Sequence, residues 1–226
     1  MSPQKIEGLP REMIALRVSR EIKDGMYVNL GIGIPTLTSN WIEGKDVYLQ
    51  AEVGMLKTGA LASAEEADQD LINASCQAVT SLPGTSYFDI VESFAMIRGG
   101  HIDVAVMGAL QINDKGDYAG WSNPTRGLFV GNVGGSMDLC AGAKKLIIAM
   151  EHTTKEGDYK VVKKLSYPAT AEGRVSLLIT DLAVIEITPQ GMVLREAMAG
   201  LTAADVQSVT EPKLIIPKEG VKEMQL

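Results

Sequence analysis

The 226-residue sequence has few of the residues that build metal centres or disulfide frameworks. Its two cysteines, Cys76 and Cys140, lie far apart without C-x-x-C spacing, and its only histidines are His101 and His152. So few and so scattered ligands predict neither a disulfide framework nor a metal site. The sequence also lacks a G-x-S-x-G motif, which argues against a serine hydrolase of the α/β type.

Basic clusters and long apolar runs are missing as well. The sequence holds 28 acidic and 21 basic residues, a net charge of −7, and its longest basic runs are pairs such as Lys144-Lys145. This argues against nucleic-acid binding. The N-terminal segment has no apolar core typical of a signal peptide, and no apolar run reaches membrane length. We expect a soluble, cytoplasmic protein without a membrane partner.

What the sequence does have is an alternation of short apolar runs with amphipathic segments. Strands are expected at 27–30, 47–50, 79–82, 104–109, 146–150, 175–180, 182–188 and 192–195, and helices at 10–24, 35–42, 89–97 and from 202. This alternation predicts an α/β fold of three layers, α/β/α, around a mostly parallel open sheet with an antiparallel extension near the C-terminus. Because no stretch reads as a linker, residues 1–226 are expected to form a single domain. Residues 113–137, dense in Gly, Asn and Asp, are expected to be a long working loop.

Three glycine-bearing segments are candidates for ligand loops. In 29–36 (NLGIGIPT) a strand ends in glycines and opens a helix, which either aims free N–H groups at an anion or makes only a tight turn. In 51–55 (AEVGM) Glu52 follows a strand end, where it could be a nucleophile, a general base or a solvated loop residue. Segment 131–138 (GNVGGSMD) either presents consecutive N–H groups to an oxyanion or turns into a helix. His152 also follows a strand end, and a structural role is favoured for it.

Longer stretches resemble the β subunit of the class I 3-oxoacid CoA-transferases, the acetate, acetoacetate and succinyl type. The matching segments are VNLGIGIPTL at 28–37, ADQDLINA at 67–74, LPGTSYFD at 82–89, ESFAMIRGGHIDVAVMGALQ at 92–111, GGSMDLCAGAKK at 134–145, MEHT at 150–153 and TPQGMVLRE at 188–196. They keep one register over nearly the whole chain. The resemblance implies the CoA-transferase fold, which is of the NagB/RpiA-like type.

The resemblance also implies a set of site residues. Glu52 aligns with the family's covalent glutamate, and Gly135 with the glycine whose amide holds the oxyanion. The family's Ser-Glu-Asn-Gly motif reads Ala-Glu-Val-Gly here, so its flanking serine and asparagine are replaced. Two further segments, 75–77 and 121–126, also depart from the family pattern, which puts the usual acyl preference in doubt. The residues expected to contact CoA or substrate are Asn29, Gly31, Gly33, Gly54, Gly134, Cys76 and Arg126.

For function, the resemblance implies transfer of CoA between an acyl-CoA and a 3-oxo or short-chain carboxylic acid. The expected route is a ping-pong mechanism through a glutamyl-CoA thioester, with coenzyme A as a substrate and no cofactor. The expected partner is an α subunit of related fold in an α2β2 heterotetramer. Two alternatives stay open. One is an acyl-CoA hydrolase that uses the same glutamate, and the other is a non-catalytic ligand-binding or sensor domain of the same fold.

Overall fold

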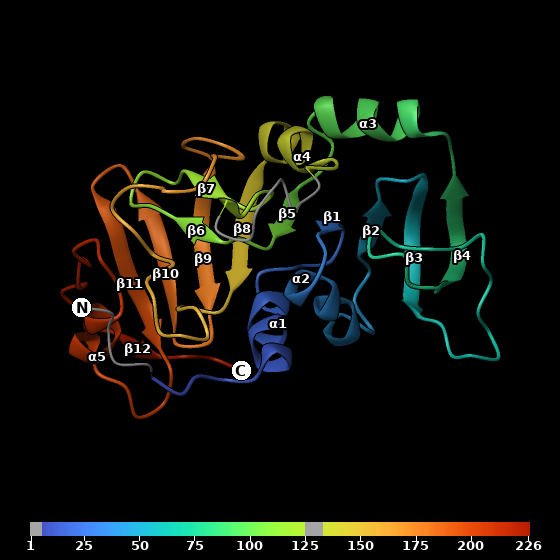
Figure 1. Ribbon diagram of the computed structural model, residues 1–226. Coiled ribbons are helices and arrows are strands. Elements are labelled where there is room, and N and C mark those ends of the chain that lie inside the picture. Colours follow the sequence, from blue (N-terminus) through green and yellow to red (C-terminus); the bar gives the residue numbers. More distant parts are fainter. Residues whose placement is uncertain (1–5, 125–132) are drawn as a thin grey trace.

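Residues 6–124 and 133–226 are described by the structure, a computed structural model of the chain. The strands are β1 (Tyr27–Leu30), β2 (Tyr48–Ala51), β3 (Met55–Leu61), β4 (Val79–Tyr87), β5 (Val104–Met107), β6 (Gln111–Ile112), β7 (Tyr118–Ala119), β8 (Lys145–Met150), β9 (Val175–Thr180), β10 (Ala183–Thr188), β11 (Gly191–Ala197) and β12 (Lys222–Glu223). Ten of them form one sheet in the order β12-β11-β10-β9-β8-β5-β1-β2-β3-β4, and β6 pairs separately with β7 (Figure 1).

The centre of the large sheet is parallel, and both of its ends carry antiparallel strands. Strands β9, β8, β5, β1 and β2 all run the same way. The expected antiparallel extension near the C-terminus is present as β10 and β11. The α/β fold with a mostly parallel sheet is therefore confirmed. The carboxyl ends of β1, β2 and β5 meet at one edge of the sheet, which is where a parallel sheet places its ligands.

A second antiparallel extension, β3 with β4, was not predicted from the sequence. Residues 55–61 are not among the strands expected from the sequence, and only 79–82 of β4 are. Gly59 explains part of the difference, because a Cβ at this position would lie 2.2 Å from Oγ1 of Thr80 on the neighbouring strand. The glycine that interrupts the apolar pattern is thus the residue that lets the two strands approach.

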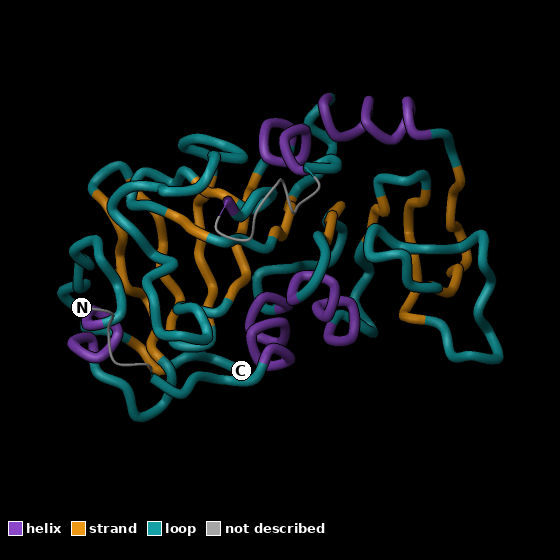
Figure 2. The backbone as a smooth tube through the Cα atoms, viewed as in Figure 1, coloured by secondary structure: helices purple, strands orange, loops and turns teal. Residues whose placement is uncertain are grey.

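Side chains on the two faces of the central strands belong to two different cores. Val104 and Val106 pack with α1 (Arg11–Ser19), whereas Ala105 and Met107 pack with α3 (Ile90–Arg98) and α4 (Ser136–Gly142). Strand β8 alternates in the same way. The sheet is therefore the middle of three layers, and Figure 2 shows α1 and its neighbours well apart from α3 and α4.

Helix ends follow local capping chemistry. The side chain of Asp89 accepts a hydrogen bond from the Glu92 N–H and begins α3, as its position predicts. Thr202 forms a capping box with Asp205 at the start of α5 (Ala203–Ser208). The helix expected over 10–24 ends at Ser19 because the next residues make tighter i→i+3 hydrogen bonds. The helix expected over 35–42 is split into α2 (Ile34–Leu37) and the 3-10 helix η1 (Thr38–Trp41).

The segment expected to be one long loop, 113–137, is partly ordered, because it contributes one strand to a small ribbon formed by β6 and β7. Strand β7 lies inside it and pairs with β6 through Gln111 and Ala119. Tyr118 is fully buried, and its hydroxyl lies 3.1 Å from the Cys140 sulfur. The ribbon thereby fixes the first part of this segment against the core. Residues 125–132 lie outside the described part of the chain.

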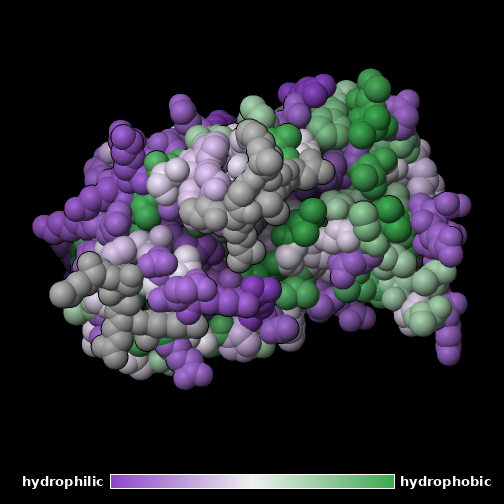
Figure 3. Space-filling view, in the orientation of Figure 1, coloured by the Kyte–Doolittle hydropathy of each residue, from purple (hydrophilic) through white to green (hydrophobic). Residues whose placement is uncertain are grey.

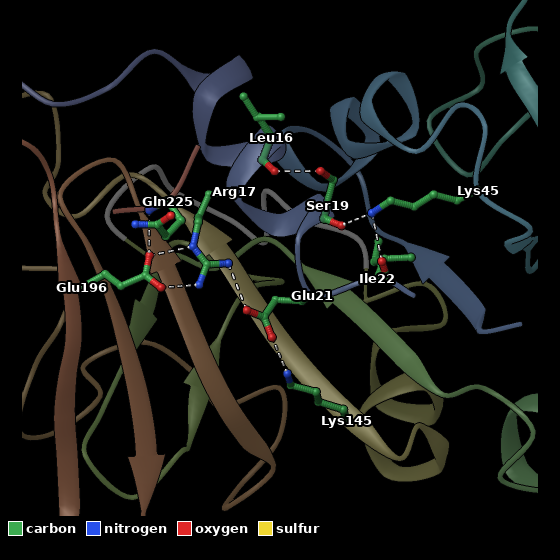
Figure 4. A network of polar contacts seen from close by, with 9 residues as sticks. All are labelled: Leu16, Arg17, Ser19, Glu21, Ile22, Lys45, Lys145, Glu196 and Gln225. Atoms are coloured by element: carbon green, nitrogen blue, oxygen red, sulfur yellow. Dashed lines mark hydrogen bonds and ion pairs between the residues drawn. The ribbon is translucent and has the colours of Figure 1, made fainter. Parts of the chain in front are cut away.

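A buried ion-pair network ties α1 to the sheet (Figure 4). The guanidinium of Arg17 donates two hydrogen bonds of 2.8 Å to the carboxylate of Glu196 on β11 and one of 2.9 Å to Glu21. Glu21 in turn accepts from Lys145 on β8 at 2.8 Å. Since Arg17 is buried, all three of its donating nitrogens need these partners. The network fixes the helix that covers one face of the parallel strands.

Candidate active site

A cavity of about 420 Å³ opens at the carboxyl ends of β1, β2 and β5. Three of the walls are strand ends, with Asn29 and Gly31 from β1, Glu52 after β2, and the segment 107–109 from β5. The fourth wall is the start of α4. The lining formed by described residues is Asn29, Gly31, Ile32, Glu52, Ala74, Met107, Gly108, Ala109, Leu110, Gly120, Val133, Gly134, Gly135, Ser136 and Leu139. Glu52 is the sole ionisable side chain among these described lining residues.

Glu52 is half-buried and is held by a neighbouring strand. Nδ2 of Asn29 lies 3.3 Å from Oε2 of Glu52 and also donates to the Gln50 carbonyl oxygen at 3.1 Å. Asn29 is buried, and its Oδ1 has no hydrogen-bond partner among the described residues. A buried oxygen without a partner is costly unless a water or ligand donates to it.

Gly135 lies directly against Glu52. A Cβ at Gly135 would lie 3.5 Å from Cγ of Glu52 and 3.1 Å from Cζ of Phe94. The Gly135 N–H has no hydrogen-bond partner in the described part of the chain. The preceding Gly134 has a φ of 47°, a left-handed conformation that suits glycine, and no atom lies within 4 Å of where its Cβ would be. The glycine pair thus brings backbone without side chains to the carboxylate.

Of the residues expected to contact substrate, three do not line the cavity. Gly33 caps α2 with a φ of 90°. Gly54, with a φ of 134°, faces the backbone of Phe88, whose carbonyl oxygen would lie 2.2 Å from a Cβ there. Cys76 is exposed on a turn. A fourth, Arg126, lies outside the described residues. The structure therefore brings together Glu52, Gly135, Gly134, Asn29 and Gly31 at one cavity, and the roles predicted for all nine residues stay predictions.

Comparison with known proteins identifies the family. The family described as Coenzyme A transferase matches residues 11–208. The chain belongs to this family. It is 46% identical over 201 residues to the B subunit of the succinyl-CoA:3-ketoacid coenzyme A transferase of Helicobacter pylori (strain ATCC 700392 / 26695), covering 89% of this chain and 96% of that one. It is 44% identical over 207 residues to the B subunit of the 3-oxoadipate CoA-transferase of Pseudomonas putida, covering 92% and 97%. The predicted family and the predicted CoA-transferase class of enzyme are confirmed.

Solved structures support the fold. The acyl-CoA transferase YdiF of Escherichia coli O157:H7 superposes with a TM-score of 0.76 at 19% identity, over 99% of this chain and 44% of that one. The chain thus spans less than half of that protein. The decarboxylase AibA/AibB superposes with a TM-score of 0.70 at 18% identity, over 97% of this chain and 90% of that one. Because the fold is shared with a decarboxylase, the fold alone does not name the reaction.

Several parts of this coenzyme A transferase site were not predicted from the sequence. Met107 is the last residue of β5, and Gly108 and Ala109 follow it, so the strand-end rule that selected Glu52 also applies to this segment. Gln50 and Ser93 lie behind the cavity wall and hydrogen-bond to each other at 3.0 Å. No sequence signal links these two, since Ser93 is on α3 and the hydrogen bond joins distant segments.

His152 is a buried structural residue of this coenzyme A transferase. It is fully buried, with Nδ1 2.9 Å from the Thr180 hydroxyl and Nε2 2.9 Å from the Thr210 hydroxyl. Burial, helped by the positive charge of Lys160, lowers the pKa of His152 to about 3, so the ring is neutral. It does not line the cavity. The structural role favoured for His152 agrees with this position.

The described ranges, 6–124 and 133–226, show neither a cluster of metal-ligating side chains nor a membrane-spanning helix. In these ranges no three His, Cys, Asp or Glu side chains gather in a way that could hold a metal ion. Within the same ranges, no helix has the length and apolar character needed to cross a membrane.

Proposed function

We propose that this chain is the subunit of a two-subunit CoA-transferase that supplies the covalent catalyst, Glu52. One observation supports this above all: among the described residues that line the 420 Å³ cavity, the only ionisable side chain is Glu52, with Asn29 on one side and Gly135 on the other. A carboxylate suits the task, because its own anhydride and thioester are close in energy to the substrates and products. Family membership makes CoA the group that moves.

The reaction begins when an oxygen of the Glu52 carboxylate attacks the carbonyl carbon of the donor acyl-CoA. The C–S bond breaks, which gives an acyl–glutamyl anhydride and CoA thiolate. The thiolate then attacks the glutamyl carbonyl carbon and expels the donor acid as its carboxylate, leaving Glu52 as a thioester with CoA. An acceptor carboxylate takes the CoA by the same two steps in reverse. These steps balance without a cofactor.

Each step passes through a tetrahedral intermediate with a negatively charged oxygen. The Gly135 N–H, which no described residue engages, lies beside Glu52 and is the backbone donor best situated to stabilise that charge. In other enzymes the loss of one such donor costs about 3–4 kcal/mol of transition-state stabilisation. No atom lies near the place of a Cβ on Gly134, so a substrate can approach the backbone closely.

The acyl groups are proposed from the relatives. Their names specify succinyl-CoA with a 3-ketoacid, 3-oxoadipate, and, in Escherichia coli K12, acetate. All of these are carboxylic acids of short chain, and two of the three names include a 3-oxo acid. We infer that this chain serves the same class of acid, and that a free carboxylate is common to every acceptor.

The partner is proposed to be an α subunit, with α2β2 as the expected assembly. The relatives are named as B or β subunits, and this chain accounts for only 44% of the YdiF chain. Large apolar side chains are exposed beside the cavity and along the β4–α3 end of the molecule: Ile32, Val53, Leu82, Tyr87, Ile90, Val91 and Met137. Figure 3 shows hydrophobic residues gathered over that part of the surface. Strand β4 is also a sheet edge with unpaired backbone groups, so this surface suits a protein partner.

Covalent trapping on the co-purified two-subunit complex tests the role of Glu52. Wild-type complex treated with succinyl-CoA or acetoacetyl-CoA and then borohydride should carry its modification on the peptide that contains Glu52. Glu52→Gln should abolish the modification and lower exchange at least about 1,000-fold. Glu12→Gln, at an exposed glutamate of α1, is the matched control and should keep both. Full exchange by Glu52→Gln would refute the proposal, and release of free CoA without an acceptor acid would favour the hydrolase.

The partner surface is tested by pull-down of the α subunit. Val91→Glu places a charge in the middle of the exposed apolar group on α3 and should abolish co-purification. Ile216→Glu, the same kind of change at an exposed apolar residue near the opposite end of the sheet, should retain the complex. If both variants co-purify with the α subunit, the partner lies on another surface.

A further inference from the structure

Behind Glu52, three buried side chains form a hydrogen-bond chain from helix α3 to the carboxylate. Nε2 of Gln50 donates to Ser93, at 3.0 Å to the hydroxyl and 3.3 Å to the carbonyl oxygen. Oε1 of Gln50 accepts from Nδ2 of Asn29 at 3.0 Å, and that Nδ2 reaches Oε2 of Glu52 at 3.3 Å. Ser93, Asn29 and Gln50 are 0%, 1% and 4% exposed, so water does not compete for these bonds.

The direction of this chain is set by groups that can only accept. The carbonyl oxygen of Ser93 cannot donate, so the NH₂ group of Gln50 must face it and Oε1 must face Asn29. The NH₂ group of Asn29 then has two hydrogens for three acceptors, Gln50 O, Gln50 Oε1 and Glu52 Oε2, so one hydrogen is shared between two of them. A reversed amide in either residue would bring oxygen against oxygen at these positions. One orientation of the Asn29 and Gln50 side-chain amides is therefore preferred.

The chain makes the two oxygens of Glu52 unequal. Oε2 accepts from Asn29, whereas no described residue donates to Oε1. An oxygen engaged in a hydrogen bond is the poorer nucleophile, so Oε1 is the oxygen left to attack a thioester carbonyl. The hydrogen bond at Oε2 also limits rotation of the carboxylate about its last bond. Position and choice of oxygen thus depend on Asn29, which depends on Gln50.

Helix α3 anchors one end of this hydrogen-bond chain, opposite to Glu52. Only two of its residues, Ser93 and Ile97, are buried, and they lie one helical turn apart. Ile97 packs in the main core, while Ser93 uses its buried position to accept from Gln50. The next residue, Phe94, borders the place where a Cβ of Gly135 would be. One turn of α3 therefore borders Gly135 through Phe94 and is linked to Glu52 through Ser93 and its hydrogen bond to Gln50.

We propose that Gln50 and Ser93 are positioning residues of this CoA-transferase, which act through Asn29 to orient the Glu52 carboxylate so that Oε1 attacks the acyl-CoA. The inference rests on the proposed role of Glu52. Neither Gln50 nor Ser93 lines the cavity, so they support the nucleophile without a contact to substrate. Their removal affects the rate of the covalent step and leaves acyl-CoA binding intact.

The test measures, in the co-purified complex, the rate at which acetoacetyl-CoA forms the trapped Glu52 thioester, together with kcat and KM. Gln50→Met keeps the side-chain length but removes the amide. It should lower kcat and the rate of thioester formation about 10- to 100-fold while KM for acyl-CoA changes less than about 2-fold. Ser93→Ala, which keeps the carbonyl acceptor, should lower kcat about 3-fold. Ile97→Val on the same helix removes no hydrogen bond and should keep the wild-type kcat.

The outcomes separate this proposal from the role of Glu52. If Glu52→Gln forms no thioester and Gln50→Met forms it slowly at unchanged KM, both proposals stand. If Glu52→Gln forms none but Gln50→Met matches the wild-type rate, or if kcat falls as much in Ile97→Val, the positioning role is refuted and the catalytic role survives. If Glu52→Gln still forms the thioester, both fail. Should Gln50→Met not fold, the kcat of Ser93→Ala at unchanged KM decides between the first two outcomes.

Discussion

Gly135, at the start of α4, lies beside Glu52, at the end of β2, in the wall of one cavity. A Cβ on Gly135 would lie 3.1 Å from Phe94 Cζ, which is closer than most such contacts, and 3.5 Å from Glu52 Cγ, which is an ordinary contact distance. The backbone φ of Gly135 is −83°, which any residue can adopt. A larger residue here would therefore crowd Phe94 and the side chain of Glu52 without straining the backbone.

Gly135→Ala is expected to damage catalysis more than stability. The added methyl group displaces Phe94 by a few tenths of an ångström and places a carbon against Glu52. We expect kcat to fall about 10-fold or more, since small shifts around reacting groups are costly. Urea unfolding should show a loss below about 1.5 kcal/mol. Gly134→Ala should lose about 1 kcal/mol for another reason, its left-handed backbone. A wild-type kcat for Gly135→Ala would contradict the arrangement.

Gly54 is expected to be required by the backbone. In Gly54→Ala the methyl group would lie 2.2 Å from the Phe88 carbonyl oxygen at a φ of 134°, and the two strands that meet there must separate. We expect a loss of more than about 3 kcal/mol in the free energy of unfolding, measured by urea titration. Gly200→Ala, at a φ of 83° with open space around it, should lose only about 1 kcal/mol. Equal stability of the two variants would show that the strands tolerate the change.

Arg17→Met should be strongly destabilising. It leaves the carboxylates of Glu196 and Glu21 partly buried without their shared partner, and we expect a loss of about 3–5 kcal/mol in the free energy of unfolding. Arg195→Met, which breaks an exposed pair with Glu186, should cost at most about 1 kcal/mol. A small loss in Arg17→Met would show that water or other groups replace the guanidinium.

The same network predicts an acid limit to stability. Burial acts to raise the pKa of Glu21, but the hydrogen bonds and charges of Lys145 and Arg17 outweigh it, so its pKa lies below 4.5. A carboxyl group whose folded pKa is lowered stabilises the protein above its unfolded pKa, and the contribution is lost as pH falls through the folded value. Glu21→Gln should therefore show a weaker loss of stability below pH 4.5 than the wild type. Urea unfolding at about pH 4.5 and about pH 3.5 compares the two, and parallel losses would contradict the lowered pKa.

His152 should make stability depend on pH in a higher range. Its folded pKa, about 3, is below the unfolded value of 6.5, so the unfolded chain takes up a proton that the folded chain does not. Its contribution is complete above pH 6.5 and declines as pH falls from 6.5 towards 3. We expect about 2 kcal/mol less stability at about pH 5 than at about pH 7 from this residue. His152→Gln, which keeps hydrogen-bonding atoms near Thr180 and Thr210, should lose that difference, and an unchanged pH slope would refute it.

Much of the fold is predictable from short stretches of the chain. Asp89 and Thr202 begin helices through hydrogen bonds to residues three positions on, and these partners are visible in the sequence. Strands β1, β5 and β9 are buried apolar runs, and they occur where those runs stand in the sequence. Glu52 was selected because it follows one such run, that of β2. Each of these signals needs only neighbours along the chain.

The sequence by itself determined the family, the alternation of strands and helices, and the carboxylate at a strand end. Only the tertiary structure decided that Gly54 faces Phe88 while Gly135 faces Glu52, and that Ser93 reaches Asn29 through Gln50. Both glycines look alike in the sequence, and a serine within a helix has no distinctive pattern. What separates them is contact between segments far apart in the chain, and such contacts exist only once the sheet and its two helical layers have packed.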